Sequence, residues 1–488
     1  MEYEATIGLE IHAELRTNTK MFCCSANSAD EKRPNVNICP VCMAHPGTLP
    51  VINKEAVRSV LRVGVALGSR LADYTEFDRK NYFYPDLPKG YQLSQYEYPL
   101  VSGGTLKGVD ITRVHLEEDT ASSIHNDATG STLIDYNRAG VPLMELVTEP
   151  VIKSAEQAGE FARELQLLLR YLGVSNANME KGEMRVEANV SIRKTTDPEG
   201  VFGTKVEIKN INSFNVMERA VRYELKRQEE LVRAGGTVVQ ETRGWDDAKQ
   251  MTFAQRVKEG SADYRYFPDP DLPSLRLSEL AGFDTATLAA TLPELPHARR
   301  ERYLTAGIKP DDADLYVRDT RFGNFFDAVA NGYDVESVLL ASNYIANDLV
   351  KIFRDRDSKN SRDILSRDSQ TNDMLGISSD SFRKLIDMIR AKKISSRAAK
   401  DILAEAAATG NDPEIIAAEK GLMQTQDAGA LEAAVQGVID QNPTVVADYR
   451  AGKEVALQFL LGQSMKALRG AADPVVLRDL LKKKLAAE

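Results

Sequence analysis

Cysteine is scarce in this chain, and its placement is informative. The 488 residues include only four cysteines, all between Cys23 and Cys42. A secreted disulfide scaffold would spread its cysteines along the chain, so this clustering favours a reducing compartment and a metal site. No run approaches the roughly 20 apolar residues of a membrane span, and the acidic start Met1–Glu4 lacks the basic region of a signal peptide. These absences predict a cytoplasmic protein with no membrane partner.

Two functional signatures are also missing. There is no G-x-x-x-x-G-K-[ST] loop, so any nucleotide site is not of the P-loop kind. Residue 2 is Glu, which excludes an N-terminal cysteine nucleophile, and no Gly/Ser-rich serine signature of an amidase is present. The sequence therefore offers no site that could release ammonia from glutamine.

Positive charge is in deficit, with a net charge of −10. Contact with a nucleic acid would therefore depend on a local basic patch, because the overall field repels polyanions. One such patch lies at the C-terminal end, where Asp448–Glu488 holds eight Lys or Arg against five Asp or Glu and includes the run Lys482–Lys484. This segment is a candidate phosphate-contacting surface, although a solvated helix end would look the same.

The length of the chain predicts about two to four domains. Residues 1–293 contain short β-branched and aromatic runs between helical patterns, which predicts an α+β domain with a mixed or antiparallel sheet. Residues 294–410 are typical of short helices, and Gly410–Pro413 is a turn signal that starts a helical tail, residues 411–488. The clearest predicted elements are strands at 3–11, 108–116, 182–192 and 203–208, and helices at 54–67, 155–172 and 212–231, the last with Ser213 as N-cap.

Acidic and imidazole side chains recur on the predicted strands. Glu10 and His12 alternate along one strand, so they face the same way. His115–Asp119 ends another strand with three consecutive acids, and Glu145 lies inside the apolar run Val141–Val147. A buried acid is paired, metal-bound or shifted in pKa, and magnesium takes oxygen ligands. Each feature alone also fits a polar strand edge or a solvated turn.

A segment dense in cations and aromatics, Asp78–Gln92, is predicted to be a rigid binding loop whose Arg79, Lys80 and Lys89 contact phosphates. The cysteines form the pair Cys23-Cys24 and the turn Cys39-Pro40-Val41-Cys42, which has the spacing of a zinc half-site. Adjacent side chains diverge, so Cys23, Cys39 and Cys42 are better candidate ligands than Cys24, and His45 is an alternative fourth ligand. Four small buried hydrophobic residues would be the alternative interpretation.

Taken together, the chain resembles the B subunits of tRNA-dependent amidotransferases (the GatB family). The segments that carry the resemblance run along nearly the whole chain, and two of them, YFYPDLPKGYQ at 82–92 and DYRYFPDPDLP at 263–273, are long and unusual. The resemblance implies a cradle-like catalytic domain of the glutamine synthetase/guanido kinase class, an all-α helical domain, and a small all-α, YqeY-like tail that binds tRNA. It also implies a glutamine-hydrolysing ligase that forms a carbon–nitrogen bond.

The same resemblance implies roles for single residues. It places Mg²⁺ on His12, Glu118 and Glu145, and makes these residues and Glu10 catalytic. The remaining expected contacts to ATP or substrate are Arg79, Lys80, Tyr82, Lys89, Glu117 and Glu149. Structural zinc is expected on Cys23, Cys24, Cys39 and Cys42, although Cys23-Cys24-Ser25 departs from the Cys-x-Cys of zinc-bearing members.

The implied reaction phosphorylates the side-chain carboxylate of Glu-tRNA(Gln) or Asp-tRNA(Asn) with ATP, and ammonia then forms the amide. The implied partners are misacylated tRNA, an amidase-type glutaminase (GatA) and a small third protein (GatC). Two other classes remain open from the residues alone. A free-standing amide ligase acting on a small acid would not need residues 294–488, and a non-catalytic tRNA-binding scaffold would not need buried acids at Glu118 and Glu145.

Overall fold

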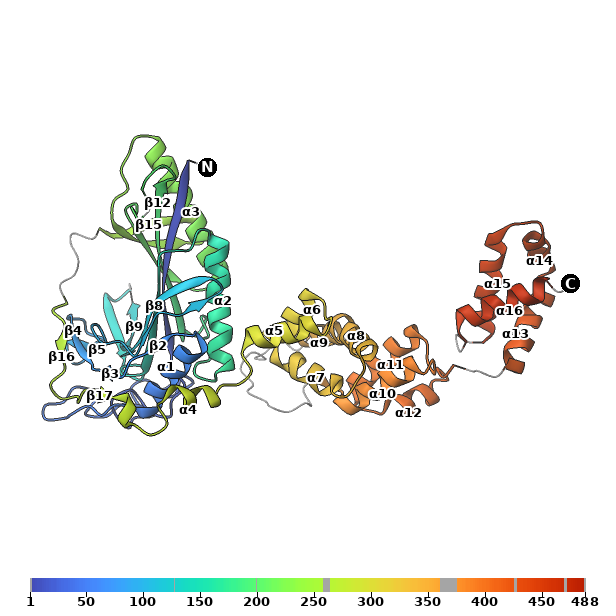
Figure 1. The fold of residues 1–488 in the computed structure, drawn as a ribbon, viewed down its shortest axis with the longest axis horizontal. Helices are drawn as coiled ribbons and strands as arrows, with labels where there is room; N and C mark the ends of the chain where they lie inside the picture. Colours follow the sequence, from blue (N-terminus) through green and yellow to red (C-terminus); the bar gives the residue numbers. More distant parts are fainter. Residues whose placement is uncertain are drawn as a thin grey trace. The chain divides into compact units, whose positions relative to one another are not determined.

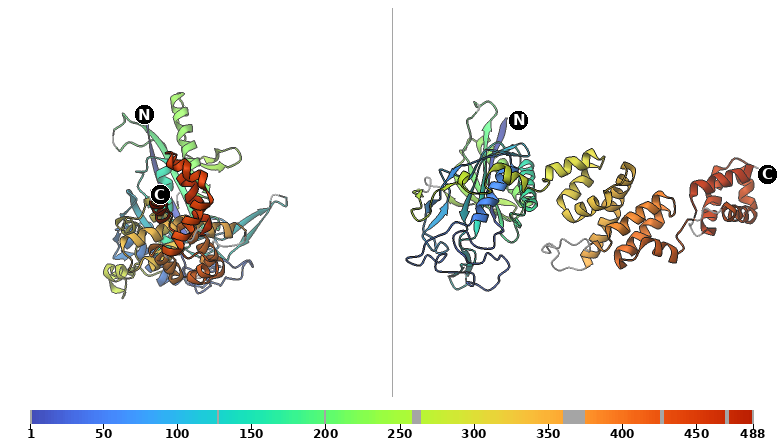
Figure 2. Two further views of the ribbon diagram at one scale, coloured as in Figure 1. Left: turned by 90° about the vertical axis from the view of Figure 1, so that its right-hand side faces the viewer. Right: turned by 60° about the horizontal axis from the view of Figure 1, so that its bottom comes forward.

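The computed structural model describes residues 2–126, 128–198, 200–257, 264–359, 375–424, 428–468 and 472–486. The chain divides into two compact units, Met1–Pro296 and His297–Glu488. The first unit holds all the described strands, and every described element from α5 onward is helical (Figures 1 and 2). The fold is thus α+β with a helical C-terminal region, as predicted.

A ten-stranded mixed sheet forms the centre of the first unit. Its order is β15-β14-β13-β12-β1-β11-β8-β6-β2, with β7 beside β8. Among these described strands, only β13 and β14 pair in parallel. The strands are β1 (Tyr3–Glu14), β2 (Arg70–Leu71), β6 (Val101–Ser102), β7 (Thr105–Leu106), β8 (Val109–Glu118), β11 (Pro142–Thr148), β12 (Met184–Lys194), β13 (Val206–Ile211), β14 (Glu241–Asp246) and β15 (Met251–Val257).

Helices cover one face of this sheet (Figure 1). They are α1 (Lys54–Ala66), α2 (Ala155–Tyr171) and α3 (Phe214–Arg233), close to the predicted ranges, and Ser213 caps α3 by accepting from the N–H of Val216. The odd-numbered residues Ile7 to Ala13 of β1 are fully buried in the same core as Phe161 and Leu165 of α2. Since strand side chains alternate, the even-numbered residues of β1 face the opposite side of the sheet.

Three short strands pack near that opposite face. They are β4 (Asp78–Asn81), β5 (Tyr91–Ser94) and β16 (Phe267–Pro268), in the order β16-β4-β5. The predicted binding loop 78–92 is therefore largely a β-hairpin, because both of its ends pair as antiparallel strands. Strands continue into the last part of the predicted domain 1–293, since β17 (Leu275–Arg276) pairs with β3 (Tyr74–Thr75). β9 (Ser122–Asn126) and β10 (Ser131–Asp135) form a separate hairpin.

The second unit is built from helices with apolar cores. Within α13–α16 a separate core includes Val435, Leu460, Leu477 and Leu481, all fully buried. No described helix combines the length and apolarity needed to cross a membrane. The helices are α4 (Thr285–Ala290) at the end of the first unit and then α5 (Pro296–Thr305), α6 (Pro310–Arg318), α7 (Thr320–Ala330), α8 (Val335–Asn343), a π-helix (Tyr344–Leu349), α9 (Val350–Lys359), α10 (Ser379–Arg390), α11 (Ser396–Thr409), α12 (Pro413–Glu419), α13 (Ala428–Gln441), α14 (Pro443–Arg450), α15 (Glu454–Ala467) and α16 (Pro474–Ala486).

Candidate functional site

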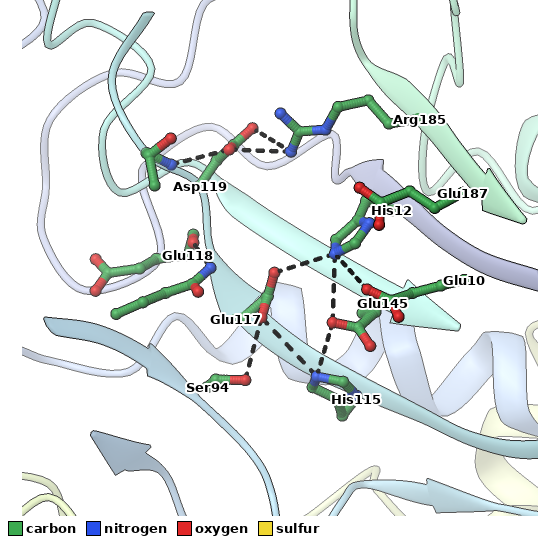
Figure 3. A network of polar contacts seen from close by, with 12 residues as sticks. Glu10, His12, Ser94, His115, Glu117, Glu118, Asp119, Glu145, Arg185 and Glu187 are labelled. Carbon is green, nitrogen blue, oxygen red and sulfur yellow. Dashed lines mark hydrogen bonds and ion pairs between the residues drawn. The ribbon is translucent and has the colours of Figure 1, made fainter. Parts of the chain in front are cut away.

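Strand register brings acids and imidazoles from three adjacent strands together. His12 of β1 lies opposite Glu145 of β11, and Glu145 in turn lies opposite His115 of β8. Glu10 and Glu117 are two residues along from these histidines, so both project from the same face. Side chains from strands as far apart in the sequence as β1 and β8 thus point toward one another (Figure 3). They lie on the face of the sheet opposite the core that contains α2.

The side chains of Glu10, His12, His115 and Glu117 lie close to that of Glu145. The Nε2 atom of His12 is 3.3 Å from Oε2 of Glu145, 3.6 Å from Oε1 of Glu117 and 4.0 Å from Oε1 of Glu10. From the other side, Nε2 of His115 is 3.4 Å from Oε2 of Glu145 and 3.9 Å from Oε2 of Glu117. Two groups with metal-ligating potential result, Glu10–His12–Glu145 and His115–Glu117–Glu145.

Burial and mutual charge shift the pKa values of these groups. Burial opposes protonation of His12, but contact with Glu145 and the charges of Glu117 and Glu10 outweigh it and raise the pKa of His12 to about 9. Burial and the charge of Glu145 raise the pKa of Glu117 to about 7. Burial lowers the pKa of His115 to about 4, so its imidazole is neutral. Carboxylates crowded in this way favour a bound cation.

Other polar groups border the cluster. The Oγ of Ser94 on β5 donates to Oε2 of Glu117 at 3.1 Å. The Arg113 guanidinium is 3.9 Å from Oε1 of Glu145. Burial lowers the pKa of Lys80, but the charges of Glu117, Tyr266 and Glu145 have the larger effect and raise this pKa above its usual value. Carboxylates and imidazoles thus form the centre of the cluster, with Lys80 and Arg113 at its edge.

Glu118 does not join this cluster, contrary to the expectation that it would meet His12 and Glu145. Its carboxylate contacts Nζ of Lys89 at 2.6 Å and accepts from the N–H of Leu93 at 3.0 Å. The reason is that consecutive strand residues diverge, so Glu117 and Glu118 cannot both reach His12. His115 is the residue that sequence reasoning missed, although its i, i+2 spacing from Glu117 was a usable signal.

The other candidate substrate contacts are spread over the hairpin and beyond. Arg79 forms ion pairs with Asp269 at 2.7 Å and with Asp271 at 3.1 Å. The central carbon of its guanidinium lies 4.4 Å from the centroid of the Tyr91 ring. The hydroxyl of Tyr82 donates to Gln92 at 3.2 Å. Glu149 lies past the end of β11 and accepts from Thr112 at 2.7 Å. The structure therefore brings Lys80 to the cluster, while Arg79 and Glu149 are engaged elsewhere.

Three of the four cysteines converge. The sulfurs of Cys23, Cys39 and Cys42 lie within 4.8 Å of one another, whereas Cys24 is exposed and outside the group. His45 is also outside this group. A pocket of about 200 Å³ is lined by Cys23, Cys42 and His45 on one side and by Lys89 and Glu118 on another. The cysteine group thus borders the ion pair of Lys89 and Glu118.

Comparisons with known proteins agree with this architecture. The GatB/GatE catalytic domain family matches residues 5–281, and the GatB domain family matches residues 324–485. Curated relatives named as the B subunit of aspartyl/glutamyl-tRNA(Asn/Gln) amidotransferase include one from Thermomicrobium roseum, 46% identical over 99% of both chains. Others come from Carboxydothermus hydrogenoformans, 42% identical over 99% of both chains, and Caldanaerobacter subterraneus, 42% identical over the full length of both.

Proposed function

The chain belongs to the GatB family, and we propose that it amidates the amino acid of Glu-tRNA(Gln) and Asp-tRNA(Asn). ATP phosphorylates the side-chain carboxylate and leaves as ADP, and ammonia then displaces the phosphate to form the amide. Activation is necessary because oxide is a very poor leaving group. The observation that carries the proposal is the convergence of Glu10, His12, Glu117 and Glu145 on one face of the sheet.

We further propose that this cluster holds Mg²⁺, with Glu117 in the place predicted for Glu118. The donor set fits, because magnesium prefers carboxylate oxygens, and burial together with the charge of Glu145 raises the pKa of Glu117, a shift that a cation beside it would oppose. When bound, magnesium neutralises charge on the transferring phosphoryl group.

The protein side chains supply positioning and protection. Ser94 orients Glu117 through its hydrogen bond, and Lys80 adds positive charge beside Glu117 and Glu145, where phosphate oxygens of ATP are expected. Burial of Glu117, Glu145 and His115 keeps bulk water from the reaction site. That exclusion matters because water would hydrolyse the acyl phosphate before ammonia reached it.

We propose a structural zinc at Cys23, Cys39 and Cys42. Their sulfurs lie close enough for one ion, and zinc favours thiolates in tetrahedral sites. Hydrogen bonding with the Cys23 thiol lowers the pKa of Cys42 against its burial, and Lys20 contributes to this shift. The fourth ligand of the zinc would be a water molecule, or Cys24 or His45 after rotation of its side chain. Neither Cys24 nor His45 belongs to the three-cysteine group.

The wider assignment follows the family. Residues 1–293 form the catalytic domain, which we place in the glutamine synthetase/guanido kinase class, 294–410 a helical domain and 411–488 a tRNA-binding tail. An amidase-type glutaminase (GatA) and a small third protein (GatC) complete a cytoplasmic complex. The absence of a glutaminase signature in this sequence supports that division of labour.

The test is transamidation by the full-length chain reconstituted with its glutaminase and small partner proteins. Misacylated Glu-tRNA(Gln), ATP and magnesium are supplied with either glutamine or ammonium, and the amino acid recovered from the tRNA is analysed. Glu117→Gln keeps the shape and removes the charge, so we expect a rate loss of about 100-fold with either nitrogen donor, with tRNA binding retained. Glu180→Gln, an exposed acid, is the matched control.

Two results would contradict the proposal. A Glu117→Gln rate equal to wild type would remove the metal-site assignment. Amidated tRNA made from glutamine by the isolated chain, without ammonium, would show that the chain has its own glutaminase. Product from the isolated chain with ammonium but not with glutamine supports the proposed division.

A further inference from the structure

Four tyrosine rings gather on the short strands β16-β4-β5, beside the cluster around Glu145. Tyr82 follows β4, Tyr96 follows β5, and Tyr264 and Tyr266 precede β16. The rings of Tyr96 and Tyr266 are stacked, with centroids 4.4 Å apart and an angle of 14° between their planes. The Tyr264 ring lies 6.1 Å from Tyr266 and 6.1 Å from Tyr82, edge to face with both. We call these four residues the tyrosine shelf.

Hydrogen bonds from Asn81 hold the backbone of the shelf. The backbone N–H and the side-chain amide of Asn81 both donate to the carbonyl of Tyr264, at 2.9 and 3.1 Å, and the amide also donates to the carbonyl of Arg265 at 2.9 Å. Arg265 has a φ of 46°, in the left-handed region that side chains other than glycine rarely adopt. Strain of this kind persists only where the surroundings impose it, and it gathers at ligand sites. Tyr264 and Tyr266 are therefore held in place before a ligand arrives, which lowers the entropy cost of binding.

Tyr96 presents an open ring at the end of this stack. It is 60% exposed although one face of its ring is covered by Tyr266, so the exposed surface belongs to the other face and the edge. Proteins bind single-stranded RNA ends by stacking unpaired bases on aromatic side chains. The pair of Tyr96 and Tyr266 can therefore be extended by one base on the side that is open.

Lys80 joins the shelf to the cluster. Its Nζ lies 5.1 Å from the centroid of the Tyr264 ring, and the carboxylates of Glu117 and Glu145 stabilise its charge and raise its pKa. A single lysine side chain thus spans the space between the shelf and the carboxylates. A glutamyl group has a similar length, whereas a triphosphate with its ribose is longer. A terminal nucleotide that carries the amino acid fits this spacing better than the adenine of an ATP whose last phosphate reacts at the cluster.

We infer that the Tyr96 ring stacks on the 3′-terminal adenine of the misacylated tRNA and so extends the stack of Tyr96 on Tyr266. The inference rests on the proposed function, because the amino acid to be amidated is esterified to this terminal adenosine. With the base fixed on the shelf, the side-chain carboxylate of that amino acid reaches the cluster beside Lys80. The shelf therefore binds and orients the substrate and takes no part in the bond-making steps.

A fluorescent base at the end of the tRNA tests this directly. tRNA(Gln) with 2-aminopurine as its 3′-terminal base is charged with glutamate and bound to the full-length chain, reconstituted with its glutaminase and small partner proteins. Stacking on an aromatic ring quenches 2-aminopurine, so we expect a several-fold fall in fluorescence with the wild type at saturating protein. Tyr96→Phe keeps the ring and should quench equally. Tyr96→Ala should leave the fluorescence near that of free tRNA and raise the KM for Glu-tRNA(Gln) about tenfold, with the KM for ATP unchanged.

Phe202→Ala is the matched control, because Phe202 is 58% exposed and lies between β12 and β13, outside the tyrosine shelf. It should quench like the wild type. Full fluorescence of the terminal base on the wild-type complex, or quenching that persists in Tyr96→Ala, would overturn the inference. A raised KM for ATP with an unchanged KM for Glu-tRNA(Gln) in Tyr96→Ala would overturn it too, because the ring would then stack on the adenine of ATP. The fluorescence needs no amidation, so a wild type that amidates its substrate with an unquenched base refutes the shelf and leaves the proposed function intact.

Discussion

Glu145 and Glu14 project from the same face of adjacent strands, yet their pKa values are shifted in opposite directions. Burial opposes the charge of Glu145, but His115, His12 and Lys80 outweigh it and lower its pKa. Glu14 lies two residues beyond His12 on β1, opposite Leu143 of β11. Burial and the charge of Asp119 raise its pKa to about 8 and outweigh Arg138 and Arg185, which lower it and are both paired with Asp119. Neighbours, more than residue type, decide which acid is charged.

We expect Glu14→Gln to stabilise the protein, and increasingly so as pH rises. Glu14 has a folded pKa of about 8 against roughly 4.3 when unfolded. The folded state therefore favours its protonated form, and the associated stability is present below about pH 4 and is lost as pH rises to 8. Glutamine is neutral throughout and can still donate to Asp119.

The measurement is the free energy of unfolding of the first unit, by denaturant titration at pH 5 and pH 8. We expect a gain of about 2 kcal/mol at pH 8 and a clearly smaller one at pH 5. Glu160→Gln, an exposed acid on α2, should show no pH-dependent gain. Equal stability of wild type and Glu14→Gln at both pH values would mean that Glu14 is charged in the folded protein.

Among secondary-structure elements, periodicity predicted the helices and long strands and failed in the hairpin. Helices α1, α2 and α3 begin and end within a few residues of their predicted limits, because their apolar stripes match the 3.6-residue period. The segment 78–92 carries charges and prolines, so its strands β4 and β5 show no apolar alternation. Pairing with each other and with β16 makes them strands, and that pairing is not local.

The segment between β1 and α1 contains the three-cysteine group and little regular structure. Among residues 15–53, turns, bends and the single bridge between Thr19 and Ala26 are the only regular features. We expect purified protein to contain one zinc, and chelation to expose this segment to protease while the circular dichroism of the sheet persists. Elemental analysis and mapping of the first cleavage sites are the measurements.

Two cysteine variants sharpen this experiment. Cys39→Ser should lose zinc and become sensitive to protease, because Cys39 lies in the three-cysteine group. Cys24→Ser should keep zinc, because Cys24 is exposed outside it. Wild-type protein free of zinc, with all thiols reactive, would remove the zinc proposal.

On the scale of the whole molecule, the C-terminal helices are separable. Among the described residues, the core formed by α13–α16 consists of side chains between Leu431 and Leu485. We expect truncation after Leu422, which keeps α12 packed against α10 and α11, to leave the rest folded and still able to bind manganese. Binding of misacylated tRNA should weaken and its dependence on salt should become shallower, because phosphate contacts are lost.

Filter binding over a range of salt concentrations measures this effect. Lys482→Ala combined with Lys483→Ala removes two exposed cations from α16 and should reproduce part of the loss. Lys32→Ala, an exposed lysine of the first unit, should not. Truncated protein that binds tRNA as tightly as the full chain would place recognition in residues 1–422.

The sequence by itself determined the α+β class, the helical C-terminal region, the family and the residue types of the proposed metal site. These depend on local periodicity and on residue types in motifs, which are readable without the fold. Only the tertiary structure decided that Glu117 and not Glu118 meets His12, and that His115 faces Glu145. That choice depends on the register of β1, β11 and β8, since a shift of one residue sends every side chain of a strand to the other face.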